Sequence, residues 1–169
     1  MKSRIQVCFY SSEISERDRF VQWATGSDVI HCGIMIDYED ISIVLCSDKF
    51  FNARFINSKA FHERYLPPKY IVDLGEKDIS VQQLVDYIDC SYRGDFRSIA
   101  FWWFGGRYLF PTLIPKTCTL LTTQLLRICG YKIKDFVSPH QLLKEFKDAT
   151  NYPIRSSGSG QNNNSSHDC

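Results

Sequence analysis

The stretch Val29-Ile30-His31-Cys32-Gly33-Ile34-Met35-Ile36-Asp37 decides the fold, because its apolar and β-branched residues predict a strand buried on both faces or nearly so. Side chains alternate between the two faces of a strand. The odd-numbered positions from His31 to Met35 therefore share one face, and the even-numbered positions from Cys32 to Ile36 share the other. We expect this strand to lie inside a sheet that is covered on both sides.

Further elements are predicted on both sides of this strand. A turn at 38–40 returns the chain through a second strand, and the aromatic and basic stretch 50–61 has room for a further short one. The other predicted strands cover 5–10, 41–46 and 70–74, with a short strand or extended segment at 131–137. The predicted helices cover 16–24, 81–90, 118–129 and 139–147. This pattern predicts an α+β domain with an antiparallel sheet.

The helix expected at 118–129 carries a cysteine in its first turn. Thr117 stands directly before an apolar run with helical spacing, and Gly130 closes that run, which predicts an N-cap and a C-terminal glycine. Unpaired amide groups at a helix start favour a thiolate over a thiol. Cys118 is therefore a candidate nucleophile, although a cysteine in an apolar helix can also be a small buried hydrophobe.

Length and charge limit the classes of function. The chain has 169 residues, enough for one domain, with 20 Lys and Arg against 19 Asp and Glu. This balance predicts binding neither to nucleic acid nor to an anionic membrane surface. No run of about 18 apolar residues predicts a membrane span. We expect a domain over 1–154, followed by a flexible tail over 155–169 that is rich in Ser, Gly and Asn.

The cysteines predict free thiols. The chain has seven, without a Cys-x-x-Cys pair, so neither a zinc ribbon nor a disulfide framework is indicated. A zinc site built from His31, Cys32 and Cys46 is disfavoured, because adjacent strand residues point to opposite faces. We therefore expect no metal and no cofactor. Free thiols and an N-terminus without an apolar signal region predict a cytoplasmic protein.

A nucleophilic cysteine needs a general base within hydrogen-bond reach. Of the four histidines, His167 falls in the tail, His62 in a polar, surface-like stretch and His140 in the first turn of the last helix. His31 begins the buried strand, beside a glycine that leaves room over the neighbouring backbone. His31 is therefore the candidate base, with a core histidine bonded to a backbone carbonyl as the alternative.

Two blocks resemble a known superfamily. The stretch Thr25-Gly26-Ser27-Asp28-Val29-Ile30-His31-Cys32-Gly33-Ile34-Met35-Ile36 resembles the histidine strand of the circularly permuted NlpC-type papain-like cysteine hydrolases. Thr117-Cys118-Thr119-Leu120-Leu121, continuing to Gly130, is similar to their later cysteine helix. The pattern His-x-Gly-Ile is also similar to the lecithin retinol acyltransferase-like branch. The resemblance implies a permuted papain-like fold, with the antiparallel sheet packed on the cysteine helix.

Members of this superfamily carry a third site residue, a Glu or a His, on the strand after the histidine strand. The corresponding strand here covers 41–46, and its register assigns Cys46 to that position. Asp48 is the nearest carboxylate on the same face and the tentative third member, since it could accept from the His31 ring. Asp48 could equally be a solvated turn residue.

The resemblance implies a hydrolase that cleaves amide bonds through a thiol acyl-enzyme, with Cys118 and His31 as the reacting pair. Its substrate would be peptide-like or acylated. Lipid or thioester acyl hydrolysis, and acyl transfer, are alternatives within the same fold. The aromatic segment 98–114 packs on the core or walls the cleft. A non-catalytic binding or assembly module is a further alternative for the function. For the location, a virus- or phage-encoded protein in the host cytoplasm or the virion is an alternative.

Overall fold

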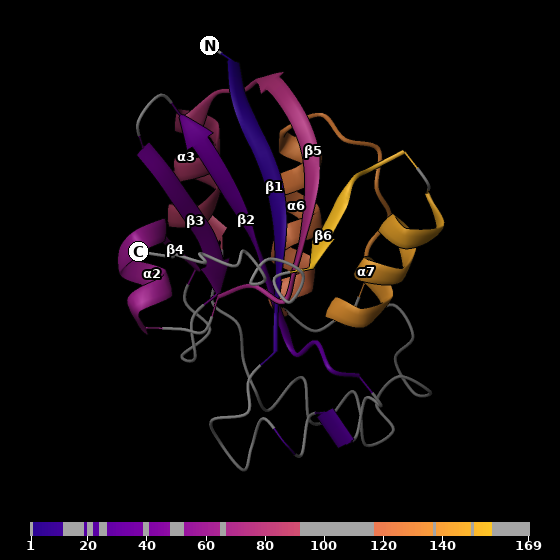
Figure 1. The fold of residues 1–169 in the computed structure, drawn as a ribbon. Coiled ribbons are helices and arrows are strands. Elements are labelled where there is room, and N and C mark those ends of the chain that lie inside the picture. The colour runs from indigo at the N-terminus through magenta and orange to yellow at the C-terminus, as the bar shows by residue number, and fades with distance from the viewer. Residues whose placement is uncertain are drawn as a thin grey trace, which may run out of the picture.

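The computed structural model describes residues 2–11, 19, 22–23, 27–38, 41–47, 53–64, 67–91, 117–136, 138–149 and 151–156. Six strands in these ranges form one antiparallel sheet in the order β4-β3-β2-β1-β5-β6 (Figure 1). Their bounds are β1 Lys2–Tyr10, β2 His31–Tyr38, β3 Ile41–Ser47, β4 Ala53–Asn57, β5 Tyr70–Asp78 and β6 Ile154–Ser156. The predicted α+β class with an antiparallel sheet is confirmed.

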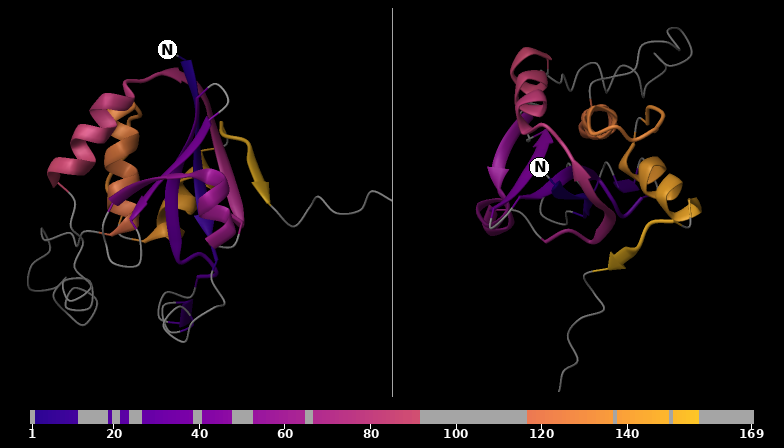
Figure 2. Two further views of the ribbon diagram at one scale, coloured as in Figure 1. Left: turned by 90° about the vertical axis from the view of Figure 1, so that its left-hand side faces the viewer. Right: turned by 90° about the horizontal axis from the view of Figure 1, so that it is seen from above.

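Helices cover both faces of this sheet. Their bounds are α2 Ser58–Arg64, α3 Val81–Ser91, α6 Cys118–Ile128 and α7 Pro139–Asp148. The two views in Figure 2 show α3 and α6 on one face of the sheet and α2 on the opposite face. α7 packs into the same apolar cluster as α3 and α6, through Leu142, Leu143 and Phe146.

Alternation along the strands produces two apolar clusters, one on each face. On the α6 side, Cys32, Ile34 and Ile36 pack with side chains of the helix such as Leu121 and Leu125. On the opposite side, a smaller cluster gathers buried side chains around α2: Cys8, Tyr10, Val44, Cys46 and Phe61. The predicted burial of β2 on both faces is therefore confirmed. The sheet forms a middle layer, which holds the start of β2 against the start of α6.

The cysteine helix has the caps that its sequence predicts. Thr117 has an extended backbone, with φ −111° and ψ 164°, and its Oγ1 accepts from the amide of Leu120 at 3.1 Å. At the other end Gly130 has a φ of +79°, a conformation that glycine adopts without a steric penalty, and its amide donates to the Arg127 carbonyl at 2.8 Å. These caps make Cys118 the first residue of the helix.

Gly33 allows β3 to lie unusually close to β2. A Cβ at this position would lie 2.8 Å from the Leu45 carbonyl oxygen and 2.9 Å from the Cys46 Cβ. The expected room over the neighbouring backbone is thus filled by β3 itself. The close approach fixes the position of Cys46 relative to the strand that begins with His31.

The structure refines or corrects the sequence prediction in four places. The stretch 131–136 forms no strand: the amide of Tyr131 binds the Leu126 carbonyl at 2.9 Å, and the Ile133 carbonyl accepts from Arg127 Nε at 2.7 Å, so the end of α6 occupies these groups. The short helix α2 was not expected, and β5 runs four residues beyond its predicted end at 74. β6 pairs with β5 and extends two residues past the expected domain end at 154.

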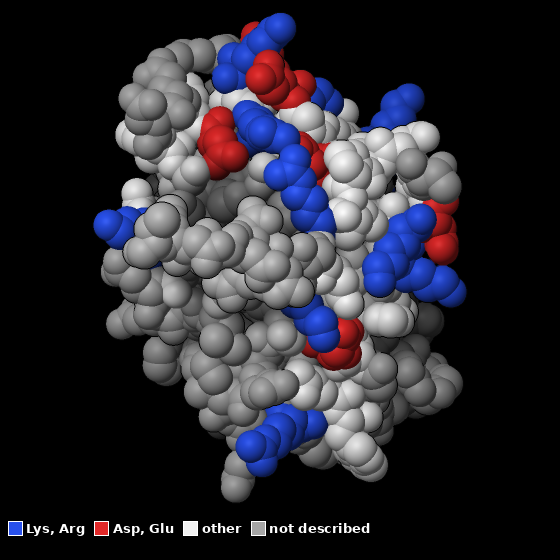
Figure 3. Space-filling view, in the orientation of Figure 1, with Lys and Arg blue, Asp and Glu red and all other residues white. Residues whose placement is uncertain are grey.

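Other expectations concern residues outside the described ranges. They include most of the helix expected at 16–24, the aromatic segment 98–114, Asp48 and most of the tail. Within the described ranges, no helix is both long and apolar enough to cross a bilayer. Acidic and basic side chains are interspersed on the face shown in Figure 3. Ion pairs in the described ranges include Arg4 with Asp73 and Lys69 with Asp28.

Candidate functional site

The candidate site lies at one end of the sheet. Tyr10 ends β1 and pairs in register with His31, which begins β2. α6 packs against β2 and β3 and begins at this same end, which is the lower end of the sheet in Figure 1. Three elements that are distant in sequence therefore meet at the first residue of the cysteine helix.

The structure brings Cys118 and His31 together, as the sequence predicts. Burial alone would lower the pKa of His31, but the negative charge of Cys118 and a hydrogen bond with it, helped by Cys46, raise that pKa to about 10. The positive charge of His31 and its hydrogen bond in turn help to lower the pKa of Cys118 well below the usual value for a thiol. A thiolate paired with an imidazolium is the expected state near neutral pH.

Cys32 is a third member of this cluster, and the sequence analysis did not identify it. Its hydrogen bond to Cys118 is the largest single influence lowering the Cys118 pKa. Burial raises the pKa of Cys32 itself, so its thiol keeps the proton, and the Cys32 Sγ donates to the Thr119 Oγ1 at 3.8 Å. The signal was present in the alternation of β2, which put Cys32 on the face that α6 covers.

Threonines on the first turns of α6 surround the two sulfurs. The Oγ1 of Thr119 lies 3.8 Å from the Cys32 Sγ and 4.0 Å from the Cys118 Sγ. The Oγ1 of Thr122 lies 3.5 Å from the Cys32 Sγ and donates to the Cys118 carbonyl at 2.9 Å. Both threonines are buried, so their hydroxyls provide polar neighbours for the sulfurs inside the fold.

Cys46 occupies the position to which its register assigned it. The pairing of Ile34 with Leu45 puts Cys46 one step further along, opposite Gly33 and on the same face of the sheet as His31. A hydrogen bond and a charge interaction with Cys46 both raise the pKa of His31. Asp48, the tentative third member, lies outside the described residues, which leaves Cys46 as the described side chain at that position.

Aromatic side chains flank the His31 ring. The ring of Tyr10 lies 5.9 Å from it, centroid to centroid, at an interplanar angle of 38°. The ring of His62 lies 6.4 Å from that of Tyr10 on the side away from α6. His62 was expected at the surface, but it is partly buried, and burial lowers its pKa. The reason is α2, whose Phe61 anchors this segment on the sheet.

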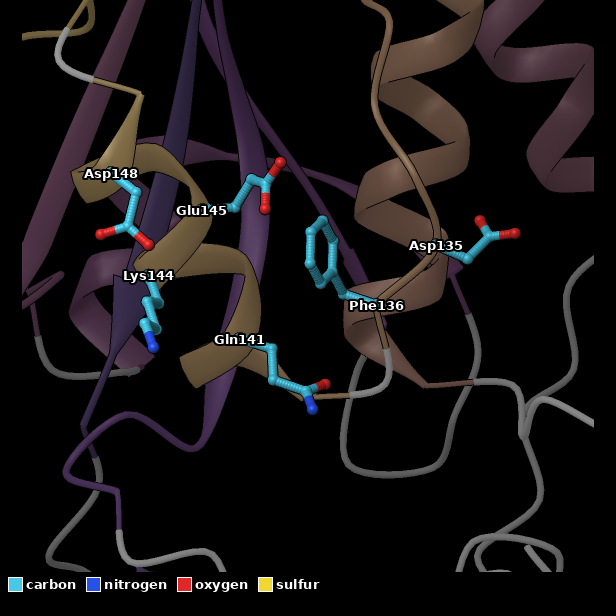
Figure 4. A pocket seen from close by; sticks show the side chains of 6 residues that line it. All are labelled: Asp135, Phe136, Gln141, Lys144, Glu145 and Asp148. Atoms are coloured by element: carbon cyan, nitrogen blue, oxygen red, sulfur yellow. The ribbon is translucent and has the colours of Figure 1, made fainter. Parts of the chain in front are cut away.

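A separate open pocket of about 500 Å³ lies between α7 and the segment before it (Figure 4). It contains none of the candidate site residues. Two of its carboxylates already pair with cations, Asp135 with Arg127 at 2.8 Å and Glu145 with Lys134 at 3.2 Å. Its lining consists of Asp135, Phe136, Gln141, Lys144, Glu145 and Asp148.

The cluster around Cys118 has the groups that nucleophilic chemistry requires. It combines a cysteine with a lowered pKa, an imidazole with a raised pKa and the start of a helix, whose backbone amides favour a negative charge beside the sulfur. Across the ranges that the structure describes, no group of three or more His, Cys, Asp or Glu side chains has an arrangement suited to a metal ion. Comparison with known proteins finds no matching family model, no matching curated protein and no matching solved structure.

Proposed function

We propose that this protein is a cysteine hydrolase of the amidase or peptidase type, which acts through a thiol acyl-enzyme. The observation that carries the proposal is the pairing of Cys118, at the start of α6, with His31, at the start of β2. Charge and hydrogen bonding between them lower the pKa of the thiol and raise that of the imidazole. Perturbations of this kind are typical of catalytic pairs.

The proposed reaction has two stages. The Cys118 thiolate attacks the carbonyl carbon, and first-turn amides of α6 stabilise the tetrahedral oxyanion. His31 gives its proton to the leaving amine as the carbon–nitrogen bond breaks, which leaves a thioester on Cys118. Neutral His31 then takes a proton from water, which attacks the thioester and releases the acid.

We also propose a permuted papain-like fold for the domain. In its support, the histidine strand precedes the cysteine helix in the chain, and the helix packs on the antiparallel sheet that contains this strand. For the third site position we propose Cys46, because its side chain interacts with the His31 ring. A thiol orients an imidazole less firmly than a carboxylate does, so we expect modest turnover.

The test is to trap the acyl-enzyme. The full chain is incubated with a panel of peptide amides and with activated acyl esters of short and long chain length, and its intact mass is recorded over time. We expect an acyl adduct on Cys118 and turnover of at least one class. Amide turnover supports the peptidase assignment, and ester turnover alone supports the lipid or thioester acyl hydrolase of the same fold.

Variants identify the groups responsible. Cys118→Ala should abolish the adduct, and His31→Ala should reduce turnover by roughly 100-fold to 10,000-fold, the usual contribution of general acid–base catalysis. The matched control is Cys129→Ala, which removes a buried cysteine at the other end of the same helix. Turnover that survives Cys118→Ala would contradict the proposal. A native chain that never acquires an adduct would favour the non-catalytic module.

A further inference from the structure

Cys32 transfers no proton and no acyl group in the proposed reaction, yet its side chain lies close to the reactive sulfur. The two sulfurs share one neighbour, because the Thr119 Oγ1 lies 3.8 Å from the Cys32 Sγ and 4.0 Å from the Cys118 Sγ. The Cys32 side chain also lowers the pKa of Cys118, an interaction that requires the two groups to lie close together. A disulfide requires its two sulfurs in bonding contact, and here both sulfurs lie against one threonine hydroxyl.

The two thiols differ in access and in proton affinity. Cys32 is fully buried, whereas Cys118 is partly exposed. An oxidant from solvent therefore meets Cys118 first, and thiolates react with peroxides far more readily than thiols do. Cys32 retains its proton and lies beside the oxidised Cys118 that this reaction produces.

We propose that Cys118 and Cys32 form a peroxide-sensing pair, in which Cys118 reacts with a hydroperoxide and Cys32 resolves the product to a reversible disulfide. The Cys118 thiolate attacks the terminal oxygen of the hydroperoxide, the oxygen–oxygen bond breaks, and the alkoxide leaves as the alcohol after taking a proton. The resulting sulfenic acid is attacked by the Cys32 sulfur. The sulfur–sulfur bond forms, the sulfur–oxygen bond breaks, and the hydroxide departs as water with the Cys32 proton. Two thiols are oxidised, and one hydroperoxide is reduced to an alcohol and water.

Cys46 is the competing partner, but it lies on the wrong face of the sheet. It packs in the cluster with Tyr10 and Phe61, whereas Cys32 packs in the cluster that contains α6. The disulfide would consume the nucleophile, so oxidation would stop acyl transfer and also protect Cys118 from irreversible sulfinic and sulfonic acids. A dithiol reductant would restore the site.

The inference shares only the Cys118 thiolate with the proposed hydrolase, and its test is independent of turnover. The reduced full chain is treated with a small molar excess of hydrogen peroxide, its remaining thiols are blocked at acidic pH, and it is digested without reductant. We expect a cross-linked pair of peptides containing Cys32 and Cys118, an intact mass lower by two hydrogen atoms, and full reversal by dithiothreitol. If the chain forms this disulfide but hydrolyses no substrate, the hydrolase proposal is contradicted and the peroxide-sensing pair is supported.

Three variants complete the test. Cys32→Ser, or Cys32→Ala as the more conservative change for a buried site, should lose the cross-link and accumulate two or three oxygen atoms on Cys118. Cys129→Ser should form the Cys32–Cys118 cross-link at the native rate, because Cys129 lies at the far end of α6. The proposal is overturned if native Cys118 is overoxidised as fast as in the Cys32 variants, if it cross-links to Cys46 instead, or if it does not react.

Discussion

At the scale of single residues, the side chains of His31 and Cys32, which are adjacent in sequence, both lower the pKa of the Cys118 thiol. His31 and Cys32 have side chains on opposite faces of β2, and alternation predicted that both could not reach one centre. Both nevertheless interact with Cys118. The reason is the position of α6, which begins at the end of the sheet where β2 begins, so Cys118 is within reach of both faces of the strand.

The pH dependence of Cys118 reactivity follows from this arrangement. A lowered thiol pKa means that the thiolate is present above that pKa and is lost only as the pH falls through it. Alkylation of Cys118 by iodoacetamide should therefore be near its plateau at neutral pH, and His31→Ala should move the midpoint upward, because it removes the imidazolium charge. Hydrolysis should also decline as the pH rises through about 10, where His31 loses its proton.

Cys129 provides the internal control in the same samples. Burial raises its pKa to about 11, so its peptide should be alkylated slowly at neutral pH. Peptide-resolved mass spectrometry separates the two rates. If Cys118 has the midpoint of an ordinary thiol, and His31→Ala leaves it unchanged, the ion pair does not exist.

At the scale of elements, the distance between β2 and β3 decides where the His31 ring meets Cys46. Gly33 is the position that permits this distance, because β3 fills the space that a side chain would need. The cap on α6 has a similar role for Cys118, since Thr117 determines which residue is the first of the helix. Gly33 thus helps to position His31, and Thr117 helps to position Cys118.

Gly33→Ala should destabilise the fold and disturb the site together. The new Cβ would lie 2.8 Å from a backbone oxygen, so β3 must move, and overpacking of this kind costs about 1–3 kcal/mol. Urea unfolding measures the loss, and alkylation of Cys118 reports the effect on the site.

Gly75→Asn is the contrasting variant. A Cβ at Gly75 meets nothing within 4 Å, and asparagine tolerates the φ of +80° at this position better than other residues do. We expect this change to cost less than the roughly 1–2 kcal/mol of an ordinary residue at such a φ, and to leave Cys118 unaffected. Equal stability of native protein and Gly33→Ala would mean that β2 and β3 are not so closely packed.

At the scale of the whole molecule, α6 connects the site to the principal core. Leu121, Leu125 and Leu126 are fully buried between the helix and the sheet, so Cys118 is attached to the larger of the two apolar clusters in the described structure. Cys8, Cys32, Cys46 and Cys129 are also buried. Their thiols therefore report opening of the fold, whereas Cys118 reports the site.

Leu125→Ala should separate these two signals. Truncation of a fully buried leucine typically costs 2–5 kcal/mol, through lost burial and the cavity that remains. Labelling of the buried cysteines should accelerate in proportion to the larger open population, while that of Cys118 changes little. The measurement is peptide-resolved labelling with N-ethylmaleimide, with urea unfolding alongside. If only the labelling of Cys118 accelerates, the substitution has opened the site and not the fold, which would contradict the prediction.

Most of the architecture could be predicted from local patterns. Alternation in 29–37 indicated a strand with two buried faces, and the caps at Thr117 and Ser138 indicated where two helices begin. Of the two alternatives for 131–136, the strand is excluded because its backbone groups bind the end of α6, a tertiary contact that composition does not encode. α2 and β6 were missed because both are short and depend on the sheet that they contact.

The sequence by itself indicated the two candidate reactive residues, since a helix start and a buried strand start are properties of short segments. Only the tertiary structure decided that Cys32 joins them and that Cys46 faces the ring of His31, because these contacts depend on how strands and helix meet in space. Hydrogen bonds across 86 or more positions depend on packing geometry, and local patterns carry no record of that geometry.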